Sequence, residues 1–215
     1  MYREFAVSDF EIELARAVAD ASGYPRPTAA GLTGHDVLFY RTDAFLTKSV
    51  VDFLAEGVRT GQPIVVIATE AHRRAFADGL RSKGLDPDQG FGDRLGVWLD
   101  AHETLESFME GSAPNRELFR TNVSELFDRI IDGRNYLVVR GYGELADLLW
   151  KDGKPDAAIL VEQHFSELAD RYKYTWLCGY AVDDFVGEED GIAGVRRICE
   201  QHKQTLPLEA IKSID

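Results

Sequence analysis

The chain has 215 residues, which is enough for one α/β domain with a well-buried core, whereas two full domains would each be small. Its composition, 45% hydrophobic and 11% aromatic, is typical of a globular protein, and no apolar run approaches the roughly 18 residues of a membrane helix. A net charge of −13, from 37 acidic and 24 basic residues, repels a phosphate backbone and argues against direct nucleic-acid binding.

The first 33 residues are expected to form an N-terminal helix and a linker, set apart from a main domain at 34–215. Ser8-Asp9-Phe10-Glu11 matches a capping box and predicts a helix over residues 9–21, followed by a Gly-, Pro- and Thr-rich loop over 22–34. This helix either packs on the domain or serves as a dimerisation or docking arm. The N-terminus carries charges and no long apolar core, so we expect no signal peptide and a cytoplasmic protein without membrane contact.

From residue 35 onward, predicted strands alternate with predicted helices. The strands are HDVLFY (35–40), PIVVIAT (63–69), LGVWL (95–99), YLVVR (136–140) and YTWLCGY (174–180). Helices are predicted over 43–59, about 70–82, a short stretch from Asp100 through Met109, NRELFRTNVSELFDRII, GELADLLW, PDAAILVEQHFSELADRY and 190–203. Strands that are apolar on both faces indicate a mostly parallel sheet of about five or more strands, flanked by helices.

In such sheets ligands bind at the carboxyl ends of the strands. The residues that follow the predicted strands are therefore the candidate ligand-binding set, with aromatic walls from Phe39, Tyr40 and Tyr142. The candidates are Tyr40, Asp43, Lys48, Ser49, Thr69, Glu70, Asp100, Arg140, Tyr142 and Glu144.

The stretch YRTDAFLTKS (40–49) places Thr47, Lys48 and Ser49 where a phosphate-binding loop of the form G-x-x-x-x-G-K-[ST] has Gly-Lys-Ser. Both glycine positions hold threonine, which is poorly suited to the positive φ that such a loop requires. Asp43 also adds negative charge where phosphate would lie. We therefore favour a structural interpretation, in which Thr42 or Asp43 caps a helix and Lys48 lies on its solvated face.

The segment Arg140-Gly-Tyr-Gly-Glu144 is expected to close a strand and open the next helix. Burial of its two opposite charges near the mouth of a cleft demands pairing. Glu144 either satisfies Arg140 and the helix N-terminus, or the two charges hold a polar ligand group or a switch loop.

No metal site and no catalytic nucleophile are predicted. Cys178 and Cys199 have no C-x-x-C motif or Cys/His cluster beside them in the sequence, so we expect buried, reduced thiols. The five histidines are scattered, without the i,i+4 pairing of a helix-borne metal site, although His35 and His202 both flank apolar runs. Asp100 is explained as a helix cap, which leaves classical ATP hydrolysis without its metal-binding carboxylate.

Several stretches, taken in order, resemble the MEDS family, the sensory domain of methanogen and methylotroph regulators such as the dichloromethane repressor. They are HDVLFYRTDAFLTKSVVDFL, GQPIVVIAT, LDAHETLESFM, RGYGELADLLW, AAILVEQHFSEL, LCGY and ICEQH, and they span residues 34 to about 205. The matching polar or aromatic positions are His35, Tyr40, Arg140, Glu144, Trp150, Glu162 and His202.

The resemblance implies a fold related to RecA/KaiC-type ATPases with a degenerate phosphate loop, and a role as a signal-input module. Family members are often attached to kinase, anti-sigma or DNA-binding output domains. The chain leaves no room for a helix-turn-helix beyond residue 205 and shows no histidine-kinase segment. We therefore expect a sensor that acts through a separate protein partner, such as a kinase, an anti-sigma factor or a transcription regulator.

The leading hypothesis is a non-enzymatic sensory domain that binds a small ligand or a protein partner at its strand ends. Binding would bias a movable segment, either RGYGE or the acidic loop DDFVGEEDG. No cofactor is required, and a bound nucleotide is disfavoured. Two alternatives stay open: an ATP-binding or weakly ATP-hydrolysing protein that uses Lys48 and Ser49, and an interaction scaffold in which the first helix forms a homodimer.

Overall fold

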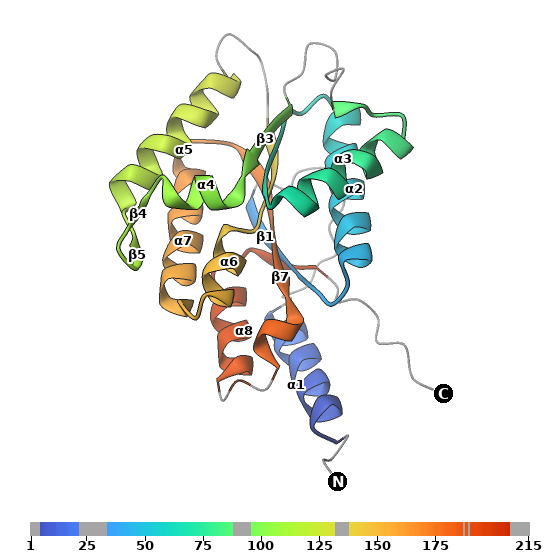
Figure 1. Cartoon of the computed structure of the whole chain (residues 1–215), viewed down its shortest axis with the longest axis vertical. Helices are drawn as coiled ribbons and strands as arrows, with labels where there is room; N and C mark the ends of the chain where they lie inside the picture. Colours follow the sequence, from blue (N-terminus) through green and yellow to red (C-terminus); the bar gives the residue numbers. More distant parts are fainter. Residues whose placement is uncertain are drawn as a thin grey trace.

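The computed structural model describes residues 5–21, 34–87, 96–131, 138–186, 188 and 190–206. Within these ranges, strands and helices alternate along the chain, and a central sheet runs between two layers of helices (Figure 1). Among the helices described, none combines the length and the apolar character needed to cross a membrane.

The central sheet is built from six strands. They are β1 (Gly34–Tyr40), β2 (Ile64–Ala68), β3 (Gly96–Asp100), β6 (Val139–Gly143), β7 (Tyr174–Ala181) and β8 (Gln204–Thr205). A separate antiparallel ribbon pairs β4 (Met109–Glu110) with β5 (Ala113–Pro114). The sequence predicted the first five strands of the sheet but neither β8 nor the ribbon, whose strands are only two residues long.

The helices carry most of the remaining described chain. They are α1 (Phe5–Ala21), α2 (Asp43–Arg59), α3 (Glu70–Ser82), α4 (Ala101–Glu106), α5 (Arg116–Ile131), α6 (Leu145–Lys151), α7 (Pro155–Glu167) and α8 (Gly191–Glu200). Two short 3-10 turns, η2 (Leu168–Asp170) and η3 (Val182–Phe185), follow α7 and β7. Helix α4 ends before Met109 and α8 ends before residue 203, so both are shorter than predicted.

The strands lie in the order β3-β2-β6-β7-β1-β8, and every neighbouring pair is parallel. The predicted α/β class with a parallel central sheet is therefore confirmed. The relation to RecA/KaiC-type ATPases stays a prediction.

Alternate residues of the central strands enter two separate cores. One core lies between the sheet and the pair α2 and α3, and includes Leu38, Val66 and Leu177. The other lies on the opposite face under α1 and α4 to α8, and includes Val37, Trp176 and other buried side chains. Figure 1 shows α2 and α3 on one side of the sheet and α5 and α7 on the other. Because both faces are covered, the strands are apolar throughout, as the sequence pattern indicated.

Helix α2 begins and ends at the predicted residues. The Thr42 hydroxyl accepts a hydrogen bond from the Phe45 backbone N–H at 3.2 Å, which satisfies one of the free donors of the first turn. Leu46, Val50 and Leu54 follow at four-residue spacing and are buried against the sheet. The capping interpretation of this stretch is therefore confirmed, with Thr42 as the capping residue.

Strand β6 corrects the prediction for the RGYGE segment. It begins at Val139 rather than at residue 136, and residues 132–137 lie outside the described part of the chain. Arg140 pairs with Ile64, the first residue of β2, so it lies near the amino ends of the strands and does not close one. The two glycines are strand residues packed under Trp176, which leaves RGYGE no freedom to serve as a movable loop.

Helix α1 begins at Phe5, so Ser8 lies inside the helix and the predicted capping box is wrong. Residues 5–8 contain no glycine or proline, so nothing in this stretch prevents the helix from beginning before Ser8. Leu14, Ala17 and Val18 are buried, and the helix packs against α8. The predicted loop at 22–34 lies outside the described residues except for Gly34, which opens β1.

Gly141→Ala is expected to lower the free energy of unfolding by about 1–3 kcal/mol, because a Cβ atom there would lie 2.0 Å from Cζ3 of Trp176. Gly143→Ala, on the same face of β6, is the matched control. Its Cβ would stand 3.0 Å from Nε1 of the same indole, so its effect should be smaller. Urea unfolding of both variants measures the difference, and equal losses would contradict this packing.

Candidate functional site

The candidate site lies at the carboxyl edge of the sheet, where β1 ends at Tyr40, β2 at Ala68, β3 at Asp100, β6 at Gly143 and β7 at Ala181. Because these strands are parallel, the residues after them gather at one edge. Most of the predicted site residues lie here: Tyr40, Asp43, Thr69, Glu70, Asp100, Tyr142 and Glu144. Three others, Lys48, Ser49 and Arg140, lie elsewhere.

Glu144 is the centre of this edge, with only 3% of its surface exposed. One carboxylate oxygen accepts the Thr69 backbone N–H at 2.6 Å, and the other lies 2.6 Å from Nδ1 of His72. The Tyr142 hydroxyl donates to the second oxygen at 3.0 Å. These contacts connect the end of β6 to the start of α3. We call Glu144, His72, Thr69 and Tyr142 the edge network.

His72 was not predicted, although it is the residue that neutralises Glu144. Its Nε2 lies 3.7 Å from the Asp43 carboxylate at the start of α2, and its ring stacks on Phe76. Tyr40 meets the imidazole edge-on. His72 lies in the first turn of α3, directly after β2, so the same strand-end rule that selected Thr69 and Glu70 would have found it if extended by two residues.

Within the edge network, Glu144 and His72 form a charged pair. Burial alone would raise the pKa of Glu144, but hydrogen bonds from His72 and the Thr69 N–H lower it below its usual value of 4.5. Burial would likewise lower the pKa of His72, whereas Glu144, with a smaller contribution from Asp43, raises it above 6.5. Each group therefore favours the ionised form of the other.

A second buried carboxylate connects α6 to the end of β7. Asp147 accepts the Ala181 backbone N–H at 3.1 Å and the Lys151 ammonium group at 2.6 Å. Lys151 also lies 3.7 Å from Asp184 in η3. Burial raises the pKa of Asp147 to about 6, although Lys151 and the Ala181 N–H act in the opposite direction. Burial and then the negative charges of this edge also raise the pKa of Tyr40.

A pocket of about 780 Å³ opens beside Lys151, between the α6–α7 connection, η3 and the start of α8. Trp150, a family-pattern position, forms part of its wall and packs on Phe185 with ring centroids 4.9 Å apart. We call this the acidic pocket, because acidic residues outnumber basic ones in its lining. Its charged residues are Lys151, Asp183, Asp184, Glu188, Asp190 and Arg197.

Asp100 and Glu70 have local structural roles. Asp100 caps α4 by accepting the backbone N–H groups of His102 and Glu103, as predicted, and it also receives Arg73 at 2.6 Å. Glu70 pairs with Arg74 one turn along α3, on the exposed surface.

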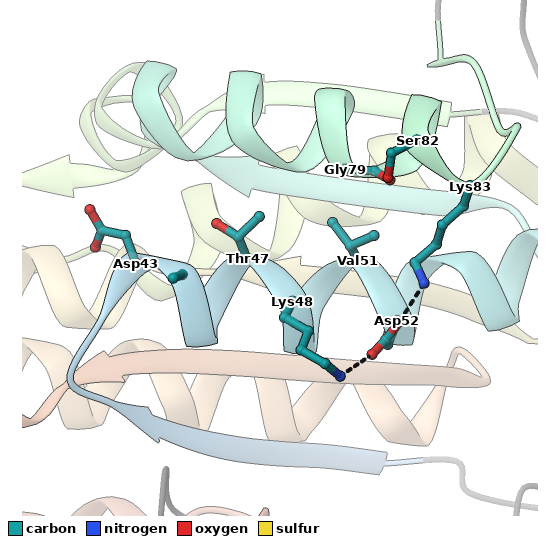
Figure 2. Close-up of a pocket in the computed structure, with 9 residues that line it drawn as sticks. Asp43, Thr47, Lys48, Val51, Asp52, Gly79, Ser82 and Lys83 are labelled. Atoms are coloured by element: carbon teal, nitrogen blue, oxygen red, sulfur yellow. Dashed lines mark hydrogen bonds and ion pairs between the residues drawn. The ribbon is translucent and has the colours of Figure 1, made fainter. Parts of the chain in front are cut away.

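Lys48 lies on the solvated side of α2, with 77% of its side chain exposed. Figure 2 shows its ammonium group directed at Asp52, which also receives Lys83 from the end of α3; both N–O distances are 2.8 Å. These residues border an open groove of about 500 Å³ between α2 and α3. Lys48 thus points away from the edge network, and Ser49, next to it on α2, has no contact with that network either.

Arg140 does not pair with Glu144, so that prediction is wrong. Its guanidinium donates to Gln62 at 2.7 Å and to the Phe53 carbonyl at 3.1 Å, and it lies over the Phe53 ring. Arg140 and Glu144 are four residue steps apart along nearly extended chain, which corresponds to about 13 Å. The two charges therefore lie at opposite ends of β6.

Three other positions of the family pattern, His35, Glu162 and His202, meet in the interior of the domain. Their ligand-type atoms lie within 4.8 Å of one another together with the thiol of a cysteine. We call this group the buried quartet; it consists of His35, Glu162, Cys178 and His202. Both cysteines of the chain are buried and free of disulfides. Sequence reasoning had treated Cys178 as an isolated thiol and the histidines as scattered.

The fold and the site together define a parallel α/β domain with a charged carboxyl edge and an adjoining pocket. Residues 34–201 match the family MEDS, described as the methanogen/methylotroph, DcmR sensory domain. Since the match covers more than half of the chain, the chain belongs to the MEDS family, and the family description indicates a sensory role. No curated protein matched the chain significantly.

His72→Gln is expected to lower the free energy of unfolding by about 1–3 kcal/mol, because Glu144 loses its charged partner. The raised pKa of His72 makes its contribution complete below 6.5 and lost as pH rises through the folded-state pKa. The lowered pKa of Glu144 makes its contribution present above 4.5 and lost as pH falls through the folded-state pKa. The difference from the unsubstituted protein should be largest between 4.5 and 6.5.

Urea unfolding at a series of pH values measures this difference. His102→Gln is the matched control, since His102 is exposed on α4 and outside the edge network. A His72→Gln effect that does not decline toward alkaline pH would show that the two side chains do not form the charged pair.

Proposed function

We propose that the protein is a non-enzymatic sensory or regulatory domain that binds a small ligand or a protein partner at the carboxyl edge of its sheet. The observation that carries this proposal is the acidic pocket beside the buried pair Asp147 and Lys151. Its volume of about 780 Å³ suits a small organic molecule, for which pockets of about 300–1,000 Å³ are usual. The signal would pass to a separate kinase, anti-sigma factor or transcription regulator.

The charges of the acidic pocket favour a ligand with positive charge or with several hydrogen-bond donors. Four acidic side chains line it against two basic ones, and both bases already have partners. Lys151 pairs with Asp147, and Arg197 donates to Asp156 at 2.6 Å. An anionic ligand would have to displace these pairs, whereas a cation meets unneutralised carboxylates.

The 3-10 turn η3 is the segment best placed to respond. Asp184 in η3 lies 3.7 Å from Lys151, whereas Asp147 lies 2.6 Å from the same ammonium group. A ligand cation that engages Asp184 would compete with this longer contact and leave the buried one intact. The turn η3, rather than RGYGE, is therefore our candidate for the movable segment.

No catalytic step is assigned to the edge network. Glu144 is the strongest candidate base, but it is 3% exposed and already engaged by His72, Thr69 and Tyr142. A base must reach the proton that it removes. An engaged, enclosed carboxylate supports a structural or signalling role instead.

The scaffold alternative depends on α1 as a dimerisation arm. Leu14, Ala17 and Val18 of α1 are buried in the core of the same chain, against α8. This face is therefore in use within the chain, which favours the packing role over the docking role.

Native mass spectrometry of the full chain, purified from its own host and again after addition of Mg-ATP, tests the proposal. We expect a co-purified small molecule and no ATP adduct, because the pocket is acidic. Asp184→Asn should reduce occupancy at least about tenfold, because it removes the charge of a partly buried carboxylate at the pocket. Asp52→Asn, which removes the same charge in the groove between α2 and α3, is the matched control and should retain the molecule.

An ATP adduct that disappears in Lys48→Ala would contradict the proposal and support the nucleotide-binding alternative. Equal loss of the co-purified molecule in Asp184→Asn and Asp52→Asn would place the ligand elsewhere. A chain that carries no adduct under either condition would remove the small-ligand form of the proposal.

A further inference from the structure

The buried quartet draws its members from four parts of the fold. His35 comes from β1, Cys178 from β7 and Glu162 from α7, and His202 follows the end of α8. The side chains of Glu162 and His202 have no exposed surface, and that of His35 is 5% exposed. The group therefore lies between the sheet and α7, on the face opposite to α2 and α3.

We propose that the buried quartet is a binding site for one Zn²⁺ ion. Neutral imidazole nitrogen, thiolate sulfur and carboxylate oxygen are the ligands that zinc takes in proteins, and four such groups fill a tetrahedral site. Because side chains of the protein fill all four coordination positions, no position is left for water or substrate. This is the arrangement of structural rather than catalytic zinc.

The separations of the donor atoms fit a tetrahedral ion. Nε2 of His35 lies 2.9 Å from Oε2 of Glu162 and 3.1 Å from Sγ of Cys178. Oε2 of Glu162 lies 3.5 Å from both Sγ of Cys178 and Nε2 of His202. With bonds of 2.0–2.3 Å, neighbouring ligands around tetrahedral zinc are about 3.3–3.8 Å apart. All four ligand atoms lie within 4.8 Å of one another, so shifts of up to about 1 Å would complete the geometry.

The hydrogen bond that Nδ1 of His202 makes fixes the tautomer of its ring. Nδ1 lies 2.6 Å from the Ile198 carbonyl oxygen, which can only accept, so Nδ1 carries the proton. In the neutral ring, Nε2 then presents a lone pair to the quartet. This nitrogen is buried, and its nearest charged group is the Glu162 carboxylate at 3.5 Å, with which it makes no hydrogen bond. A buried acceptor without a donor is costly, and a cation in the quartet would satisfy it.

His35 is arranged in the same way. Its Nδ1 lies 3.4 Å from the Ser166 hydroxyl, which itself donates to the Gln201 carbonyl at 3.3 Å, so Nδ1 is the donor. Nε2 therefore turns its lone pair toward the Glu162 carboxylate. The other oxygen of Glu162 accepts from the Tyr180 hydroxyl. Partners of this kind hold metal-binding side chains in their ligating orientation.

An ion pair without metal explains less of this geometry. Without a metal, protons on Nε2 of both His35 and His202 are needed to satisfy the two contacts with Glu162, which would bury two imidazolium charges beside one carboxylate. Zn²⁺ satisfies both imidazoles, and its two positive charges balance the Glu162 carboxylate and the Cys178 thiolate. Binding would release the thiol proton of Cys178 to solvent. The bound ion would join β1, β7 and α7 to the segment that leads into β8.

The test uses the untagged full chain, stripped with a chelator and titrated with Zn²⁺ in competition with a chromophoric chelator. We expect one ion per chain and a higher melting temperature with zinc, because an ion bound only by the folded state stabilises it. Cys178→Ser and His202→Gln should each weaken zinc affinity at least about tenfold. Cys199→Ser and His164→Gln replace buried residues outside the quartet and should leave it unchanged.

Replacement of zinc by Co²⁺ gives a readout that does not depend on stability. The Co²⁺ protein should show a thiolate-to-metal charge-transfer band, which is absent in Cys178→Ser and retained in Cys199→Ser. A stripped, folded chain that takes up no zinc, or zinc affinity that Cys178→Ser leaves unaltered, would overturn the proposal. Neither result depends on ligand occupancy of the acidic pocket, so the two proposals fail separately.

Discussion

Burial of the sheet on both faces is the constraint on which the rest of the structure depends. A polar side chain along a strand that is covered on both sides must find a partner inside or lie at a strand end. The chain uses both solutions. Glu144 lies just past the end of β6 and is paired with His72, while His35 and Cys178 lie within strands and meet Glu162 in the interior.

Strands β1 and β7 connect the buried quartet in the interior to the carboxyl edge of the sheet. Strand β1 carries His35 near its amino end and Tyr40 at its carboxyl end. Strand β7 supplies Cys178 to the quartet and Tyr180 as a hydrogen-bond donor to Glu162. Its last residue, Ala181, donates its N–H to Asp147. A change in the position of β7 would therefore affect Glu162 and Asp147 together. The contacts of the quartet hold β7 in place beside η3, the turn that we propose responds to a ligand.

Local patterns in the sequence specify elements and caps well, and tertiary partners poorly. The bounds of α2 follow from Thr42 and the spacing of Leu46, Val50 and Leu54, all of which are local. Strand β6 was misplaced because apolar residues before Arg140 suggested the strand, whereas the glycines that continue it are specified by Trp176 on β7. The buried quartet was missed for the same reason: its members come from four elements, so no spacing along the chain reveals them.

The charges at two helix N-termini argue against phosphate binding by YRTDAFLTKS, despite its resemblance to a phosphate-binding loop. Such termini attract anions, and a phosphate site would depend on them. At α2, the Thr42 hydroxyl already accepts the Phe45 N–H, and Asp43 adds a negative charge beside it. At α3, the Glu144 carboxylate already accepts the Thr69 N–H. At each of these termini one of the protein's own acceptors thus takes a backbone donor and a carboxylate adds negative charge, which disfavours a phosphate group there.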